Sequence, residues 1–229
     1  MRTSAGIFCR AVLFVAAVSL LSSCAILSRE VQPGVSHGRA YAVASWYGSD
    51  FHGRPTASGE IFNMHAPTCA HREFPFGTKV RVTNLTNNRS MECTVNDRGP
   101  FIPGRDIDLS YAVAKEIGVI GPGTSRVLLE LNGRDDSYVR RVRVQAAERK
   151  GTFAIQAGAF TEAANALRLR SALALKYDNV YIQETEVNGT LFHRVRIGNF
   201  NNFKSAYSLA EQLGAEGYQP VIVKADLRI

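Results

Sequence analysis

Residues 95–110 read VNDRGPFIPGRDIDLS, a charged stretch with little that could form a helix. Three aspartates and two arginines stand among Gly–Pro and Pro–Gly pairs, and such pairs break helices and mark loops. The stretch is therefore a loop between strands, rich in carboxyl groups. It serves either as a catalytic loop or as a well-hydrogen-bonded turn, and the surrounding sequence has to decide between them.

Short β-type segments surround this loop from residue 40 to residue 132. Side chains of Lys79 and Arg81 alternate with Val80 and Val82, the period of a half-buried strand. The one helical segment is SYAVAKEIG, where Ser110 can cap the N-terminus and a glycine ends the helix. Many short strands with one short helix predict a small closed barrel. The expected strands are AYAVASWYG, TKVRVTNLT, SMECTVND and SRVLLELN.

Four motifs of this region resemble the rare lipoprotein A family: ASWYG, FHGRPTASGEIF, FPFGTKVRVTNL and VNDRGPFIPGRDIDLS. The resemblance implies a six-stranded double-psi β-barrel over residues 40–132. It also implies an endolytic transglycosylase of the division septum, which cuts the bond from N-acetylmuramic acid to N-acetylglucosamine without water. The products would end in 1,6-anhydro-muramic acid, and strands lacking stem peptides would be preferred.

The resemblance also implies a set of catalytic residues. Asp108 corresponds by motif to the catalytic aspartate of related barrels and is the first candidate for the acid/base. Asp97 is the second candidate, and Glu60 with His71 would complete the cleft. An acid of this kind must keep its proton near neutral pH, which requires burial or a nearby negative charge to raise its pKa.

Other residues of the barrel have open alternatives. Either aspartate can instead accept backbone N–H bonds or pair with an arginine. Trp46 and Tyr47 can be core residues or platforms that stack on sugar rings, and Arg98 is a candidate for substrate binding. Asn63 stands where many relatives have an aspartate, so an alternative function is an expansin-like protein that binds peptidoglycan without cutting it.

The segment 151–229 alternates strands and helices in the order βαββαβ, an α+β, RNP-like arrangement. Helices are expected from Thr161 to Tyr177 and from Phe203 to Leu213. Strand parity predicts an open sheet face that carries the polar side chains of Gln156, Arg194 and Arg196.

This second half resembles the SPOR domain, on the segments FAIQAGAF and HRVRIGNF. The resemblance implies binding of peptide-free glycan strands, with the three polar residues of the open face at the glycan. Nucleic acid is not an expected partner, because the aromatic residues that would stack on bases are missing from the sheet.

Residues 1–23 have the layout of an export signal, with an apolar run too short to span a bilayer. The sequence LSSC resembles the lipobox of bacterial lipoproteins, so Cys24 is expected to carry the lipid, and residues 24–39 would form a tether. Ala25 in the next position favours the outer membrane. We therefore expect an outer-membrane lipoprotein that faces the periplasm and gathers at the septum.

Two cysteines remain once the signal and the lipidated position are set aside. In an exported protein Cys69 and Cys93 can form a disulfide, although two separate buried thiols are the alternative. No Cys/His spacing predicts a metal site, and no cofactor is expected.

Residues 133–150 are expected to be a basic linker in a chain of net charge +7. The expected partners are denuded peptidoglycan, the membrane through its lipid anchor, and the division-site amidases that supply substrate.

Overall fold

The computed structural model describes residues 38–146 and 149–225. The predicted signal peptide, Cys24 and the tether up to residue 37 lie outside the described residues. No helix in the described ranges is long and apolar enough to cross a membrane.

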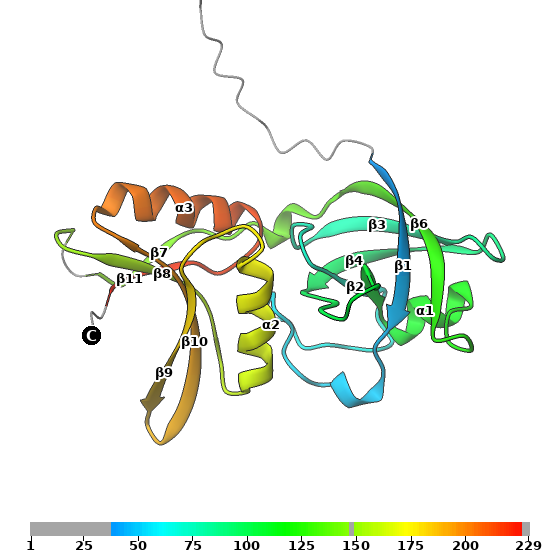
Figure 1. Ribbon diagram of the computed structural model, residues 1–229, viewed down its shortest axis with the longest axis horizontal. Coiled ribbons are helices and arrows are strands. Elements are labelled where there is room, and N and C mark those ends of the chain that lie inside the picture. Colours follow the sequence, from blue (N-terminus) through cyan, green and yellow to red (C-terminus); the bar gives the residue numbers. More distant parts are fainter. Residues whose placement is uncertain (1–37, 147–148, 226–229) are drawn as a thin grey trace, which may run out of the picture. The chain divides into compact units, whose positions relative to one another are not determined.

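The first domain is a closed barrel in which the strands follow the order β1-β5-β2-β4-β3-β6 (Figure 1). Two of its pairings are parallel, β1 with β5 and β2 with β4, and the others are antiparallel. The six-stranded barrel expected from the sequence is confirmed. Its strands are β1 (Arg39–Trp46), β2 (Thr68–His71), β3 (Thr78–Asn84), β4 (Ser90–Asp97), β5 (Ile107–Leu109) and β6 (Thr124–Arg134).

Alternation along β3 places its apolar side chains inside the barrel. Val80 and Val82 are fully buried, whereas Arg81 between them is exposed. Burying each valine contributes roughly 1.5–3 kcal/mol before the cost of ordering the chain. The period of two predicted for this strand is therefore confirmed.

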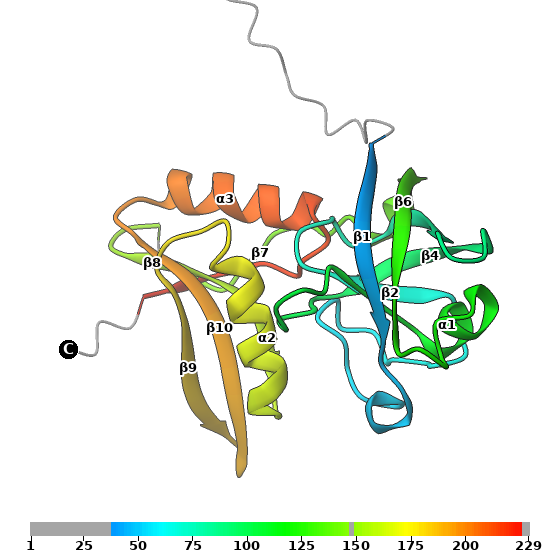
Figure 2. The ribbon, with the colours of Figure 1, turned by 45° about the vertical axis from the view of Figure 1, so that its right-hand side comes forward.

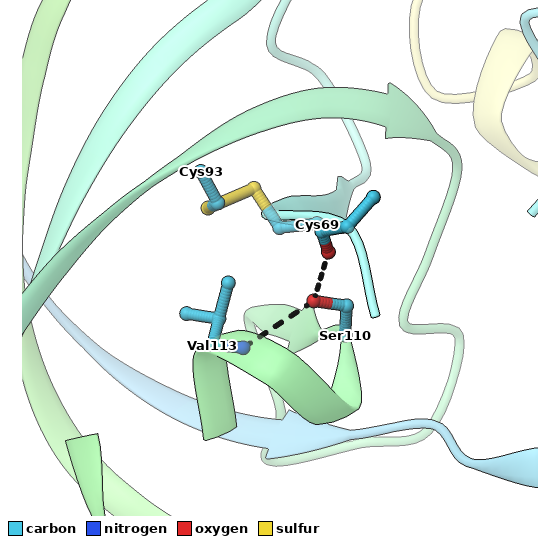
Figure 3. The surroundings of a disulfide bond; sticks show 5 residues. Cys69, Cys93, Ser110 and Val113 are labelled. Atoms are coloured by element: carbon cyan, nitrogen blue, oxygen red, sulfur yellow. Dashed lines mark hydrogen bonds between the residues drawn. A yellow bond between two sulfur atoms is a disulfide. The ribbon is translucent and has the colours of Figure 1, made fainter. Parts of the chain in front are cut away.

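Helix α1 (Tyr111–Ile117) follows β5 and begins as expected. Ser110 accepts a hydrogen bond from the backbone N–H of Val113 at 3.4 Å, and Gly118 ends the helix in the left-handed region at φ 78°. Figure 3 shows this capped turn together with the disulfide that Cys69 and Cys93 form between β2 and β4. Both cysteines are buried, so the disulfide ties neighbouring strands within the core.

The second domain is a five-stranded sheet with the order β7-β11-β8-β10-β9 and two helices. Figures 1 and 2 show β9 and β10 as one long antiparallel hairpin. The strands are β7 (Arg143–Val144), β8 (Phe153–Phe160), β9 (Val180–Val187), β10 (Thr190–Phe200) and β11 (Val221–Lys224), and the helices are α2 (Ala163–Leu173) and α3 (Phe203–Ala215).

Parity along β8 separates the two faces of this sheet. Phe153 and Ile155 pack in the core with residues of both helices, whereas Ala154 packs with Val221 and Val223 in a separate small cluster. Phe153 and Ile155 therefore lie on the face that the helices cover, and Ala154 lies on the opposite face.

The helix bounds differ from the expected ones. Helix α2 begins at Ala163 and ends at Leu173, and Glu162 rather than Thr161 stands at its cap position, without a side-chain hydrogen bond. Helix α3 begins at Phe203 as expected, with the Asn202 side chain accepting a hydrogen bond from the backbone N–H of Ser205, but it continues to Ala215.

The segment expected as a linker is partly structured. Strand β6 extends to Arg134, Tyr138 is buried, and β7 pairs in parallel with β11. Backbone hydrogen bonds from Arg140 and Arg143 also reach residues of the second domain. The described residues from Gly38 onward form one compact unit.

Candidate active site in the barrel

A cavity of about 250 Å³ lies at the ends of the barrel strands. Its wall includes two of the predicted catalytic residues, Asp97 and Asp108, and residue Arg168 of helix α2. The remaining wall is mostly apolar or aromatic, as in typical sugar and small-molecule sites. The lining residues are Tyr47, Phe51, Ala70, Asp97, Arg98, Gly99, Pro100, Phe101, Ile102, Arg105, Asp108 and Arg168.

Asp97 ends strand β4 and lies against the loop that precedes β2. Its Oδ1 accepts backbone N–H bonds from Ala57 and Arg98, both at 2.8 Å. Burial raises the pKa of Asp97, while these two hydrogen bonds and the charges of Arg168 and Arg98 act in the opposite direction. The net effect is a raised pKa for Asp97, which favours the protonated form of the carboxyl group. Both hydrogen bonds fall on Oδ1, so a proton can be held on Oδ2.

Asp108 on β5 has different surroundings. Arg105 Nη2 donates to both carboxylate oxygens of Asp108, at 3.0 and 3.2 Å, and Ser45 Oγ donates to Oδ1. The side chain is 13% exposed. Asp108 is therefore an ion-pair partner at the cavity wall.

Asp106, the third aspartate of the opening stretch, has a structural role. Its carboxylate accepts a backbone N–H bond from Val43 at 2.8 Å and pairs with Arg72 at 3.1 Å. The stretch 95–110 thus combines both alternatives, since Asp106 anchors the turn while Asp97 and Asp108 line the cavity.

Glu60 and His71 are not among the residues that line this cavity. Glu60 Oε2 accepts a hydrogen bond from Asn96 at 2.8 Å. His71 stacks on Phe74 with ring centroids 3.6 Å apart, and its Nδ1 accepts backbone N–H bonds from Glu73 and Phe74.

Burial, followed by the charges of Arg98 and Arg72, lowers the pKa of His71 to about 4. At neutral pH the imidazole is therefore uncharged. Because its Nδ1 accepts hydrogen bonds, its proton is on Nε2.

Tyr47 lines the cavity and packs its ring against Phe51 and Phe62, at centroid distances of 5.9 and 4.3 Å. Burial, with the charges of Asp97 and Asp108, raises the pKa of Tyr47, so it remains a neutral phenol. Trp46 instead packs against the core beside Tyr111.

Arg98 is fully buried and engaged in structural contacts. Its Nε donates to Tyr218 Oη at 2.7 Å, its Nη1 donates to Phe74 O at 2.9 Å, and its guanidinium lies 3.7 Å from the centroid of the Phe76 ring. These contacts join the loop after Asp97 to the second domain. Arg98 also lines the cavity, and its buried Nη2 makes no hydrogen bond within the described residues, so its substrate-binding role stays a prediction.

Asn63, the residue that stands in place of an acid, is exposed and lies in a turn. Its Oδ1 accepts a hydrogen bond from the backbone N–H of His65 at 3.0 Å. Asn63 is not among the cavity-lining residues. An aspartate at this position would therefore not add a carboxyl group to the lining of the cavity.

The predicted polar shelf of the second domain is only partly exposed. Gln156 and Arg194 are partly exposed, but Arg196 is only 4% exposed, so the expectation of an exposed Arg196 is wrong. The pairing of β10 with β8 shifts between Val195 and Arg196, which interrupts the simple alternation of inward and outward side chains. Gln156 lines a second cavity of about 260 Å³ with Arg143 and Gln219 among others.

Within the described ranges, no group of three or more His, Cys, Asp or Glu side chains is arranged to hold a metal ion. The candidate chemistry therefore rests on the carboxyl groups of the cavity.

A double-psi barrel with a carboxyl-lined cavity, followed by a SPOR-type sheet, defines the class of this protein, and comparisons with known proteins agree. Residues 39–129 match the family model described as lytic transglycolase, and residues 150–224 match the SPOR domain. The chain is 35% identical over 181 residues to the endolytic peptidoglycan transglycosylase RlpA of Vibrio cholerae, covering 79% of this chain and 67% of that one. This chain belongs to the RlpA family.

Two further relatives match mainly in the barrel. The RlpA of Pseudomonas aeruginosa is 46% identical over 108 residues, covering 46% of this chain and 31% of that protein. The probable RlpA of Synechocystis is 55% identical over 89 residues, covering 39% of this chain and 28% of that protein. The chain thus spans about a third or less of the length of these two relatives.

Proposed function

We propose that this protein is a lytic transglycosylase that cleaves the glycan strands of peptidoglycan, with Asp97 as the acid and then the base. The observation that carries the proposal is the carboxyl group of Asp97 at the cavity wall, whose burial raises its pKa. A carboxyl group whose pKa is raised keeps its proton to higher pH and can donate that proton to a glycosidic oxygen. The names of the relatives support the same activity.

The reaction balances without water. Asp97 gives its proton to the oxygen that links C1 of N-acetylmuramic acid to N-acetylglucosamine, and the C1–O bond breaks. The C6 hydroxyl of the same muramic acid then attacks C1, and its proton passes to the Asp97 carboxylate. The products are a 1,6-anhydro-muramic end and a free N-acetylglucosamine end, and the acid is regenerated.

Asp108 has a different part in this proposal, because Arg105 and Ser45 already occupy its oxygens. Its negative charge can instead stabilise the positive charge that develops on the sugar ring as the bond breaks. Between the two candidates predicted from the sequence, the geometry favours Asp97 as the acid.

The second domain would hold the barrel on peptide-free strands at the division septum. Its match to the SPOR domain and the polar cavity beside Gln156 support this role. Binding through this domain raises the effective concentration of the barrel at its substrate. Amidases that remove stem peptides would supply such strands. A pull-down of the wild type and of Gln156→Ala with amidase-treated sacculi tests this role, and equal retention of the two would contradict it.

Lipid attachment at Cys24 would place the protein on the periplasmic side of the outer membrane. Several acyl chains on one residue anchor stably, where a single chain gives marginal binding. Metabolic labelling with a palmitate analogue tests this, and label that persists in Cys24→Ala would contradict it.

Glycan binding without cleavage, the expansin-like alternative, depended on Asn63 as a missing catalytic acid. Asn63 lies in an exposed turn and is not among the residues that line the cavity, which supports cleavage over binding alone.

The direct test compares the wild type with Asp97→Asn and Asp108→Asn on amidase-treated sacculi. We expect Asp97→Asn to lose at least about a hundredfold in the release of soluble glycan, since general acid–base catalysis contributes about 10²–10⁴ in rate. Asp108→Asn should retain measurable activity. Normal activity of Asp97→Asn would contradict the assignment.

A further inference from the structure

A residue of the second domain completes the wall of the barrel cavity. Arg168 lies on α2, yet it lines the same cavity as Asp97 and Asp108. Its guanidinium carbon is 4.9 Å from the centroid of the Phe51 ring, which also lines that cavity. The charge of Arg168 also acts on the Asp97 carboxyl group. The cavity is therefore composite, with a cation that the barrel sequence does not supply.

The other two arginines of the cavity are engaged in contacts within the protein. Arg105 donates to both oxygens of Asp108. Arg98 uses its Nε on Tyr218 and its Nη1 on backbone carbonyls. Arg98 Nη2 and Arg105 Nε make no hydrogen bond within the described residues, but both atoms are buried, so these two guanidinium groups are held mainly by protein contacts.

Arg168 is engaged differently. Within the described part of the chain its hydrogen bonding uses Nη1 alone, on Asn165 Oδ1 at 3.1 Å, one turn earlier in the same helix. Asn165 is buried, so it can fix the direction of the arginine side chain, and the Phe51 ring supports the guanidinium on the barrel side. The remaining N–H groups of a partly exposed guanidinium are then pre-arranged for an acceptor in the cavity.

The chemistry of the substrate identifies that acceptor. In a peptide-free strand the lactyl group of muramic acid ends in a carboxylate, whereas with a stem peptide attached the same carbon is a neutral amide. In this cavity the Asp108 carboxylate is already paired with Arg105, and Arg168 adds a positive charge that favours an anionic ligand. An arginine binds a carboxylate through charge-assisted, often bidentate hydrogen bonds that an amide cannot match.

We propose that Arg168 binds the lactyl carboxylate of peptide-free muramic acid in the barrel cavity, so that the second domain contributes directly to substrate selection at the cleavage site. This inference rests on the proposed transglycosylase function. It assigns part of the preference for naked strands to the cleavage site, separately from any glycan binding by the sheet of the second domain.

The test uses the full-length protein and two substrates. One is amidase-stripped glycan strands, and the other is the same strands with their lactyl carboxylates converted to neutral methylamides. The variants are Arg168→Gln, Arg168→Lys and, as a matched control, Arg170→Gln. Arg170 is an exposed arginine of the same helix that does not line the cavity. The readout is kcat/KM for anhydro-product formation on each substrate.

We expect the wild type to prefer the carboxylate strands by about tenfold or more, the size of one charge-assisted contact. Arg168→Gln should lose that preference by slowing only on carboxylate strands. Arg168→Lys should recover part of it, and Arg170→Gln should behave as the wild type. Equal slowing of Arg168→Gln on both substrates, or a wild type without preference, would overturn the inference while leaving the transglycosylase function intact. A wild type that forms no anhydro product on either substrate would instead overturn the proposed function itself.

Discussion

Asp97 and Asp108 flank the same residue of the barrel, because Ala70 on β2 is the register partner of Asp97 on β4 and of Asp108 on β5. Neighbouring strands lie about 4.8 Å apart, so the two aspartate Cα atoms are separated by roughly 10 Å. All three residues line the cavity. Ala70 contributes only a methyl group to the cavity wall between the two aspartates, and we expect a sugar ring to occupy the space beside it.

Ala70→Val should close this space. Added methyl groups would enter the region where a sugar must lie between the two carboxyl groups, so activity should fall at least tenfold, since small displacements of reacting groups cost about that much or more. Overpacking also costs about 1–3 kcal/mol of stability.

The matched control for this substitution is Ala44→Val. Ala44 is fully buried on β1 but does not line the cavity. It should lose comparable stability in urea unfolding and retain activity. Equal activity of the two variants on sacculi would argue against a substrate site at Ala70.

Asp97→Asn should stabilise the protein at neutral pH. Burial raises the pKa of Asp97 above its unfolded value. The folded state therefore binds the proton more tightly, and this contribution to stability is present at acidic pH and lost as pH rises through the folded pKa. Asparagine keeps the Oδ1 acceptor without the charge. A gain of about 1 kcal/mol would raise Tm by about 2–4 °C in a chain of this size.

Thermal unfolding from pH 3 to pH 8 checks this expectation. The gain in Tm should be present at pH 8 and should shrink toward pH 3, where the aspartate is also neutral. A variant that is less stable than the wild type at pH 8 would show that the Asp97 charge is well accommodated.

His71 should make the barrel sensitive to mild acid. Its pKa is lowered from 6.5 to about 4 in the folded state. Between these two pH values the imidazole is therefore protonated in the unfolded chain but neutral in the folded chain. Stability should therefore fall as pH drops from about 6.5 to 4, by roughly 2 kcal/mol after allowance for its partial exposure.

His71→Asn keeps an acceptor near the two backbone N–H groups and removes this titration. Urea unfolding at pH 7 and pH 4.5 measures the effect, and the wild type should lose more stability than the variant between these values. Parallel losses would contradict the assignment of a neutral, buried imidazole.

Tyr218→Phe should weaken the contact between the two domains. The substitution leaves Arg98 Nε, in a fully buried side chain, without the hydroxyl to which it donates at 2.7 Å. An unsatisfied buried donor costs about 1–3 kcal/mol, and more when it is charged. Tyr207→Phe is the control, because Tyr207 is 38% exposed and should change stability by less than about 0.5 kcal/mol. Equal unfolding midpoints of the two variants in urea would indicate that Arg98 finds another partner.

Much of the barrel could be predicted from its strands, but its site could not be predicted completely. The alternation along β3, the Ser110 cap and the barrel motifs were sufficient for the fold. Strands β2 and β5 have only four and three residues, too short to establish a period, and they carry Ala70 and Asp108. Their pairing is set by closure of the barrel, which involves residues far apart in the sequence.

Burial and interdomain packing account for the remaining differences. The sequence gives the charge of Arg98 but not its burial against Phe76 and Tyr218. Arg168 has the pattern of an ordinary polar residue on an amphipathic helix. Its position at the cavity follows only from the packing of α2 against the barrel, which no local pattern encodes.

The most direct test of cleavage without water is to run the reaction of the wild type in water enriched in ¹⁸O and to measure the masses of the glycan ends by mass spectrometry. Intramolecular attack by the C6 hydroxyl predicts 1,6-anhydro-muramic ends that carry no label, and these ends should be lost in Asp97→Asn. New reducing muramic ends, absent from a control without enzyme, would mean that water is the nucleophile, and would contradict a lytic transglycosylase.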